Sequence, residues 1–168
     1  MQSAVLVAAV TIFAIVAYDD VRFRRIPNML SLSVAALGIS RLVIAHNTVA
    51  AGYTVAAGIL TFAVTFLLFW RGAIGGGDAK LITVTTLLIG HQQLLNFLLL
   101  MSVSGGLLAI VVLVREKFIP MSDRDRQLAA EPSLTVTTLS VPTTQRTTTV
   151  PYGVAIAVAG AITLMMAR

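Results

Sequence analysis

The stretch LITVTTLLIGHQQLLNFLLLMSVSGGLLAIVVLV, residues 81–114, contains no charged residue and decides the fold class of this chain. As a single α-helix with a rise of 1.5 Å per residue it would be about 51 Å long, whereas a bilayer has a hydrocarbon core of about 30 Å. The polar cluster Gly90-His91-Gln92-Gln93 interrupts the stretch and is its natural break. We therefore expect two shorter membrane helices, one on each side of this cluster.

Four further apolar runs complete the pattern, at residues 3–18, 28–45, 50–70 and 150–167. The chain is 57% hydrophobic, which is more apolar surface than a soluble domain of 168 residues can bury. The first run lacks the basic start of a secretory signal, so we expect it to be retained as a helix. The sequence predicts an all-α membrane protein, a polytopic bundle of about six transmembrane helices.

The basic residues are distributed as expected for a membrane protein. The net charge of +5 comes from short segments between the apolar runs, so we expect no nucleic-acid partner. Only Arg41 and Arg168 lie on one side of the predicted membrane. The ten on the other side are Arg22, Arg24, Arg25, Arg71, Lys80, Arg115, Lys117, Arg124, Arg126 and Arg146. This asymmetry predicts that these ten are cytoplasmic and that both termini lie outside, in a multi-pass protein of the inner (cytoplasmic) membrane.

Several kinds of chemistry are disfavoured by composition. The chain has no Cys, which excludes disulfides, thiolate catalysis and Cys-ligated zinc. Its two histidines, His46 and His91, stand apart from each other, which argues against a histidine-rich metal site. We expect neither a metal nor a cofactor.

The segment 115–149 differs in composition from the rest of the chain. It is charged at first and then rich in Thr, Ser and Pro, with too few large apolar residues to build a core. We expect a flexible cytoplasmic loop within one transmembrane domain that spans residues 1–168. An unstructured connector is the simpler interpretation, and a partner-binding segment is the alternative.

Three features meet at the predicted cytoplasmic boundary. Asp19-Asp20 ends the first apolar run, Gly75-Gly76-Gly77-Asp78 precedes the fourth, and Pro151-Tyr152-Gly153 begins the last. Carboxylates beside membrane spans are costly and usually functional. When two lie close together at low dielectric, one tends to keep a proton, which provides a general base for water and a general acid for a leaving amine. This pattern predicts peptide hydrolysis by paired acids.

The two acids could be told apart by their helix ends. A helix N-terminus would favour the anion of Asp78, so we hypothesise that Asp78 is the base and Asp20 the protonated partner. The arginines near Asp20 act against this assignment, because they favour the anion of Asp20. The three glycines would let an extended substrate backbone approach closely. The alternative is a flexible turn in which Asp78 caps the next helix. Pro27-Asn28 and Pro151 are typical of helix starts.

Three blocks of the sequence resemble one known family. Residues 20–28 (DVRFRRIPN), 75–81 (GGGDAKL) and 150–155 (VPYGVA) are similar, in order and spacing, to the type IV prepilin peptidases. These are membrane aspartyl proteases of the GxGD kind. The chain is most similar to the short, single-domain members that serve tight-adherence (Flp-type) pilus systems. The resemblance extends over nearly the whole chain.

The resemblance implies a function and a set of site residues. The family's first catalytic aspartate lies seven residues before a proline, which selects Asp20 over Asp19, and the second is Asp78. The expected substrate is a prepilin or pseudopilin precursor, a leader followed by a hydrophobic helix, cleaved on the cytoplasmic side of the bilayer. Pilus assembly machinery is a further candidate partner. Expected substrate-binding or site-shaping residues are Gly75, Gly76, Gly77, Lys80, Asp19, Pro27, Asn28, Pro151, Tyr152 and Gly153.

Longer family members carry an N-terminal cytoplasmic region with paired cysteines that is associated with N-methylation. This chain shows neither the region nor the cysteines, so N-methyltransferase activity is not expected.

Three other functions compete with this one. A GxGD protease that cuts within transmembrane helices, as presenilins and signal-peptide peptidases do, would be larger and carry its aspartates deeper in the spans. A proton-coupled transporter could use Asp20 and Asp78 as a relay, although no inverted repeat is evident. A non-catalytic scaffold of a secretion system would tolerate loss of either acid.

Overall fold

The computed structural model describes residues 2–23, 27–44, 47–118 and 152–167, and within these ranges every regular element is helical. The elements are α1 (Gln2–Phe23), α2 (Asn28–Ile44), α3 (Thr48–Trp70), α4 (Gly76–Ile89), the 3-10 helix η1 (His91–Gln93), α5 (Leu94–Phe118) and α7 (Tyr152–Met166). The predicted all-α fold is confirmed for the described part of the chain.

Three of the described helices are long and apolar enough to cross a membrane. They lie at Ala4–Phe23, Thr48–Trp70 and His91–Val114, whereas α2 and α7 are shorter apolar helices. Large apolar side chains such as Leu95 and Val103 are exposed on the outside of the bundle, where lipid would contact them. The chain is therefore a membrane protein, while six crossings and external termini stay predictions.

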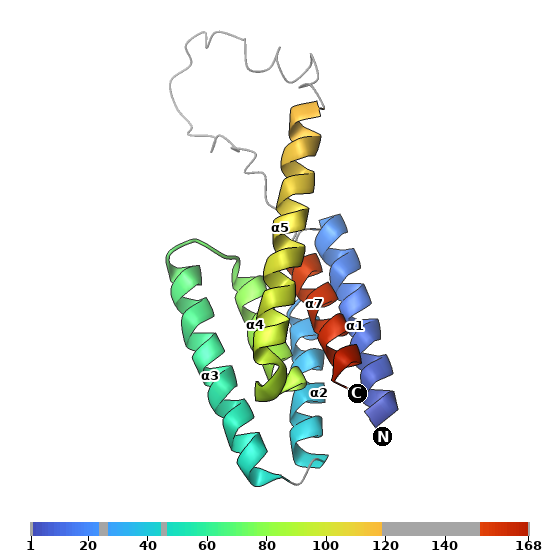
Figure 1. Ribbon diagram of the computed structural model, residues 1–168, viewed down its shortest axis with the longest axis vertical. Helices are drawn as coiled ribbons and strands as arrows, with labels where there is room; N and C mark the ends of the chain where they lie inside the picture. Colours follow the sequence, from blue (N-terminus) through green and yellow to red (C-terminus); the bar gives the residue numbers. More distant parts are fainter. Residues whose placement is uncertain (1, 24–26, 45–46, 119–151, 168) are drawn as a thin grey trace, which may run out of the picture.

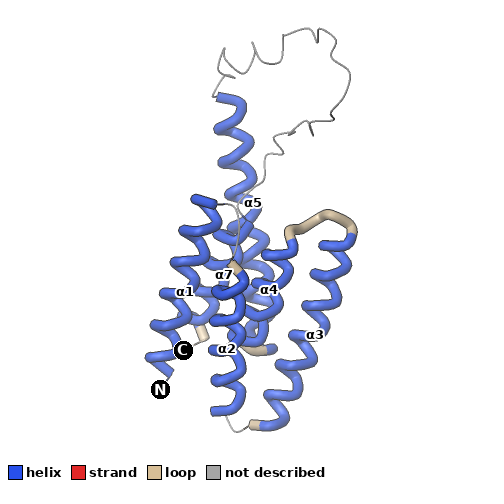
Figure 2. The backbone as a smooth tube through the Cα atoms, turned by 180° about the vertical axis from the view of Figure 1, so that it is seen from behind, coloured by secondary structure: helices blue, strands red, loops and turns tan. Residues whose placement is uncertain are grey.

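Successive helices run in alternating directions, and α4 lies among its neighbours (Figure 1). It packs against α2, α3 and α7, while α1 packs against α2 and α7, and α5 packs against α7. Seen from behind in Figure 2, the loop between α3 and α4 lies at the same end of the bundle as the C-terminus of α1. We call this the aspartate end, because Asp20 and Asp78 lie there, and we call the other the Gly90 end.

Small residues allow the helices to approach closely. A Cβ atom on Gly58 of α3 would lie 2.6 Å from Leu87 Cδ2 of α4, and one on Gly160 of α7 would lie 2.8 Å from Phe13 Cζ of α1. Lipid tails are as apolar as the side chains, so association of membrane helices depends on such close packing. The small residues Ala155, Ala157 and Ala159 of α7 are all almost fully buried, as such close packing requires.

The break between α4 and α5 is where the sequence predicts it. Gly90 has φ +87° and ψ 161°, a backbone conformation that side-chain-bearing residues rarely adopt, and the 3-10 turn η1 follows. The polar cluster at 90–93 thus ends one helix and starts the next.

Two predicted boundaries are wrong. Helix α1 continues to Phe23 rather than ending at Tyr18, because no glycine or proline interrupts the chain there, so Asp19 and Asp20 lie within the helix. Helix α5 continues to Phe118, so the loop predicted from residue 115 starts later. The remainder of that loop, together with His46 and Pro151, lies outside the described residues.

Candidate active site

Asp20 lies on the buried face of α1, with 6% of its surface exposed, whereas Asp19 is only partly buried. Asp20 Oδ2 accepts a hydrogen bond of 3.1 Å from the backbone N–H of Val154, in the first turn of α7. First-turn N–H groups have no partner within their own helix, and the helix N-terminus carries partial positive charge. The contact therefore stabilises the anion of Asp20.

Gly153 allows this contact between α1 and α7. A Cβ atom at position 153 would lie 2.7 Å from both Cγ and Oδ2 of Asp20, closer than real Cβ contacts. Any other residue at this position would have to displace the carboxylate or the helix. Tyr152, the preceding residue, is about half exposed and faces Gly105 of α5. The structure thus places Gly153 beside Asp20, with Tyr152 next to it in the chain and facing α5.

Asp78 is the third residue of α4, and its carboxylate turns back toward the start of the helix. Gly75 is the N-cap residue, in an extended conformation, and its backbone forms a hydrogen bond with Asp78. This is the geometry of an acidic residue that caps its own helix. Gly76 and Gly77 belong to the first helical turn, so only Gly75 of the three glycines has an extended backbone. The structure therefore agrees with the alternative in which Asp78 caps α4. It does not contain an extended segment of all three glycines along which a substrate backbone could lie.

The two carboxylates interact although they belong to different helices. Asp78 precedes the charge-free span that begins at Leu81. Burial first, and the charge of Asp20 second, raise the pKa of Asp78 from 3.8 to about 6, while the hydrogen bond from the Gly75 backbone acts in the opposite direction. Because its pKa is raised, the Asp78 carboxyl stays protonated to a higher pH than an ordinary aspartate does.

These features favour roles opposite to those hypothesised from the sequence. The positive end of α7 lies beside Asp20, while burial and Asp20 oppose ionisation of Asp78. The sequence reasoning considered only the helix end beside Asp78. Arg22 instead contacts residues of its own helix, because its Nη1 donates to the Tyr18 hydroxyl at 3.1 Å and its guanidinium lies over the Phe23 ring. Arg24 and Arg25 lie outside the described residues.

Other predicted residues surround the start of α4. Lys80 Nζ donates to Asn28 Oδ1 at 3.3 Å, which joins the beginnings of α4 and α2. The carbonyl of Pro27 accepts a hydrogen bond from Leu30, so the predicted helix start is confirmed. Phe69 of α3 was not predicted: a Cβ atom on Gly76 would be 3.2 Å from its ring. No local pattern marks Phe69, because the contact depends on how α3 meets α4.

The described residues contain no group of three or more His, Cys, Asp or Glu side chains placed to hold a metal ion. What they bring together at the aspartate end is a pair of carboxylates, a helix N-terminus and an exposed glycine loop. A carboxyl pair of this kind can hold a proton on one member and leave the other ionised.

Fold and site together define a helical membrane protein with an aspartate pair at the ends of its helices. The chain belongs to the type IV leader peptidase family, whose model matches residues 7–110, a range that includes both Asp20 and Asp78. The predicted family is thereby confirmed, and the membership supports a protease with prepilin-like substrates. Neither the comparison with curated proteins nor that with solved structures returned a match. Helix α7, which contacts Asp20, lies beyond the matched range.

Proposed function

We propose that this protein is a membrane aspartyl endopeptidase that removes the leader peptide from type IV prepilin-like precursors of the Flp type at the cytoplasmic membrane face. Asp20 and Asp78 are its proposed catalytic residues. The observation that supports this most directly is the effect of the Asp20 charge on Asp78, two acids from separate helices of a leader peptidase fold. Proximity of this kind is what paired-acid hydrolysis needs.

The geometry suggests how the pair would divide the work. The Asp20 carboxylate, held by Val154 N–H, would take a proton from a water molecule as the water oxygen attacks the scissile carbonyl carbon. The protonated Asp78 carboxyl would give its proton to the departing amine nitrogen as the C–N bond breaks. The pair then holds one proton again, now on Asp20, and exchange with solvent restores the starting state.

The surroundings of Asp78 suit an extended peptide. The turn between α3 and α4 is mostly exposed, and a Cβ atom on its Gly72 would meet nothing within 4 Å. Extended substrates bind by hydrogen bonds to a backbone that they can approach closely, and the exposed turn leaves space for such an approach. A site at the helix ends would also cut a leader at the membrane surface while the hydrophobic helix of the precursor stays in the bilayer. Cutting in mid-span, as the intramembrane alternative requires, is less compatible with this position.

The proposal is tested by co-expression with a candidate prepilin precursor from the same genome, with cleavage followed by the size of the precursor. We expect Asp20→Asn and Asp78→Asn each to lower the cleavage rate by at least about 10²-fold, because each removes a general acid or base. Asp19→Asn is the matched comparison, since it removes a neighbouring carboxylate that is only partly buried and has no proposed role in proton transfer; it should lower the rate far less than Asp20→Asn does. Full processing by the Asp78→Asn variant would overturn the aspartyl-protease proposal and favour a scaffold.

A further inference from the structure

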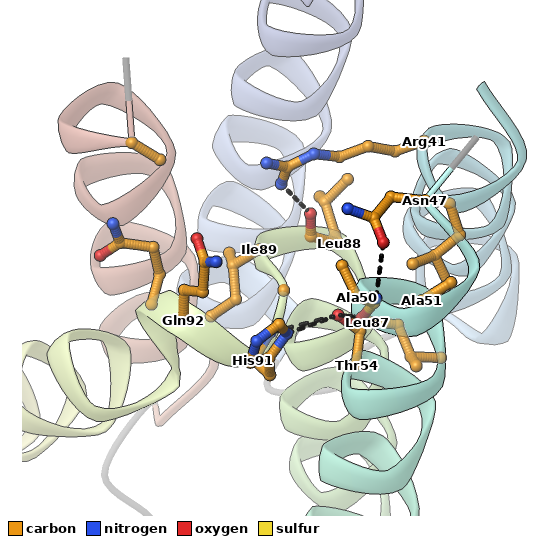
Figure 3. Close-up of a pocket in the computed structure, with 14 residues that line it drawn as sticks. Arg41, Asn47, Ala50, Ala51, Thr54, Leu87, Leu88, Ile89, His91 and Gln92 are labelled. Atoms are coloured by element: carbon orange, nitrogen blue, oxygen red, sulfur yellow. Dashed lines mark hydrogen bonds between the residues drawn. The ribbon is translucent and has the colours of Figure 1, made fainter. Parts of the chain in front are cut away.

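A second polar site lies at the Gly90 end of the bundle, away from the aspartates. A pocket of about 190 Å³ opens there between the ends of α2 and α4, the start of α3, and η1 (Figure 3). It is separated from Asp78 by most of the length of α4, about 20 Å at 1.5 Å per residue. The polar side chains that line it are Arg41, Asn47, Thr54, His91, Gln92 and Gln93. No acidic residue is among the described residues of its lining.

Arg41 is the charged group of this pocket. Its Nη1 donates to the carbonyl of Leu88, one of the last carbonyls of α4, which have no partner within their helix. A guanidinium has five N–H donors, and this bond uses one of them. Arg41 is also the one Lys or Arg that the described ranges place at this end of the bundle. Capping α4 therefore accounts for part of its donor capacity, and no acidic side chain among the described lining residues neutralises its positive charge.

Asn47 adds further donors beside Arg41. Its Oδ1 accepts the N–H of Ala50 at 3.0 Å, so the amide oxygen is committed to capping α3. Figure 3 shows the amide nitrogen of Asn47 on the side that faces Arg41. The cationic N–H groups of Arg41 and the amide N–H groups of Asn47 thus point into the same pocket. Such a set of donors matches an anion that has several oxygen acceptors.

Thr54 and His91, which line another side of the pocket, are held in place by contacts with each other and with Tyr53. Thr54 Oγ1 lies 3.2 Å from His91 Nδ1 and accepts the His91 backbone N–H at 3.4 Å, while the ring of Tyr53 packs 5.6 Å from the His91 ring. Tyr53 is largely exposed on the outside of α3. Amphipathic aromatic side chains are enriched at headgroup depth in membranes. The pocket therefore opens at a membrane boundary rather than within the hydrocarbon layer.

We propose that this pocket binds the phosphate of an anionic phospholipid headgroup, with Arg41 and Asn47 as its donors. The ligand follows from the depth of the pocket, from a guanidinium with no acidic side chain among the described residues of the lining, and from the convergence of N–H groups on a space of this size. Arginine suits phosphate because its planar fork presents parallel donors to two oxygens. This site is independent of the proposed peptidase activity and makes no use of Asp20 or Asp78.

The test uses the purified full chain in an uncharged detergent, with the thermal unfolding midpoint followed as ligand is added. Short-chain phosphatidylglycerol should raise the midpoint saturably, since a ligand that binds only the folded state stabilises it, and short-chain phosphatidylcholine should raise it much less. Arg41→Gln should weaken the apparent affinity for phosphatidylglycerol by at least about tenfold, the value of one charge-assisted hydrogen bond. Arg71→Gln is the matched control, because it removes an exposed arginine at the aspartate end and should change nothing.

Inorganic phosphate forms a third arm that identifies the source of the anion. A response to phosphate alone, lost in Arg41→Gln, supports a phosphate site supplied from solution instead of lipid. Equal responses to phosphatidylglycerol and phosphatidylcholine, or equal affinities in Arg41→Gln and Arg71→Gln, overturn the proposal.

Loss of the Leu88 contact could itself unfold Arg41→Gln, so a second variant leaves that contact intact. Ala51→Leu places a larger side chain in the lining of the pocket and keeps the charge of Arg41. It should weaken phosphatidylglycerol binding as Arg41→Gln does, and unchanged binding in this variant equally overturns the proposal.

Discussion

Replacing Gly153 with alanine is the sharpest test of how α7 supports the aspartate pair. The new Cβ atom would lie 2.7 Å from Cγ and Oδ2 of Asp20, and ordinary contacts begin at 3.4 Å, so the Asp20 carboxylate must move by about 0.7 Å. Asp20 is 6% exposed and is held by Val154 N–H, so it has little room to move without losing that hydrogen bond. A displacement near 1 Å at a reacting group can cost about 10²-fold in rate.

We therefore expect Gly153→Ala to lower the rate of precursor cleavage by about 100-fold. The assay is the initial rate of cleavage of a purified precursor by purified protein in detergent. Gly106→Ala on α5 is the matched control, because it makes the same change within a helix and its Cβ atom would meet nothing within 4 Å. Alanine is the better helix former by about 1 kcal/mol, so loss of helicity would not explain a slow Gly153→Ala enzyme. Cleavage by Gly153→Ala at the rate of Gly106→Ala would refute the reasoning.

Three further predictions concern Asp78 and Gly90. Precursor cleavage, measured as kcat/KM, should fall as the pH rises through about 6, because Asp78 then loses the proton that it donates; a flat profile from roughly pH 5 to pH 8 contradicts this. The folded pKa of Asp78 is raised from 3.8, so the stability associated with its protonated form is complete below pH 3.8 and is lost as the pH rises through about 6. Asp78→Asn should therefore raise Tm relative to wild type at about pH 8 but hardly at about pH 4, and equal shifts at both would count against the burial of this carboxyl. Gly90→Ala forces a side chain onto φ +87° and should lower the free energy of unfolding by about 1–3 kcal/mol, measured by unfolding in mixed detergent; stability equal to that of the open-space control Gly52→Ala would contradict it.

The helical membrane fold could be predicted because it depends on local properties. The length of an apolar run and the polar cluster at 90–93 that interrupts it are both visible in neighbouring residues, whereas the positive φ of Gly90 was seen only in the structure. The end of α1 was predicted less well. Charge at Asp19 marks where the sequence becomes polar, but a helix continues until its backbone is interrupted, and here it continues to Phe23.

The aspartate pair was predictable as a pair, but its electrostatics were not. Asp20 and Asp78 could be placed at one end of the bundle from the alternation of the helices. The hydrogen bond from Val154 and the close approach of Gly153 join residues far apart in sequence, and no spacing rule reveals them. The same holds for Phe69 over Gly76, because that contact depends on the angle at which two helices meet.

The hydrogen bond between α1 and α7 also has a consequence for the order in which the protein is made. Asp20 emerges from the ribosome early, whereas the N–H group that holds it belongs to the helix that follows all the other described helices. A nascent chain that has inserted only α1 to α5 would contain both aspartates and would not yet have the hydrogen bond from Val154 N–H to Asp20. The geometry of Asp20 would therefore be completed only when α7, the last described helix, has packed against α1.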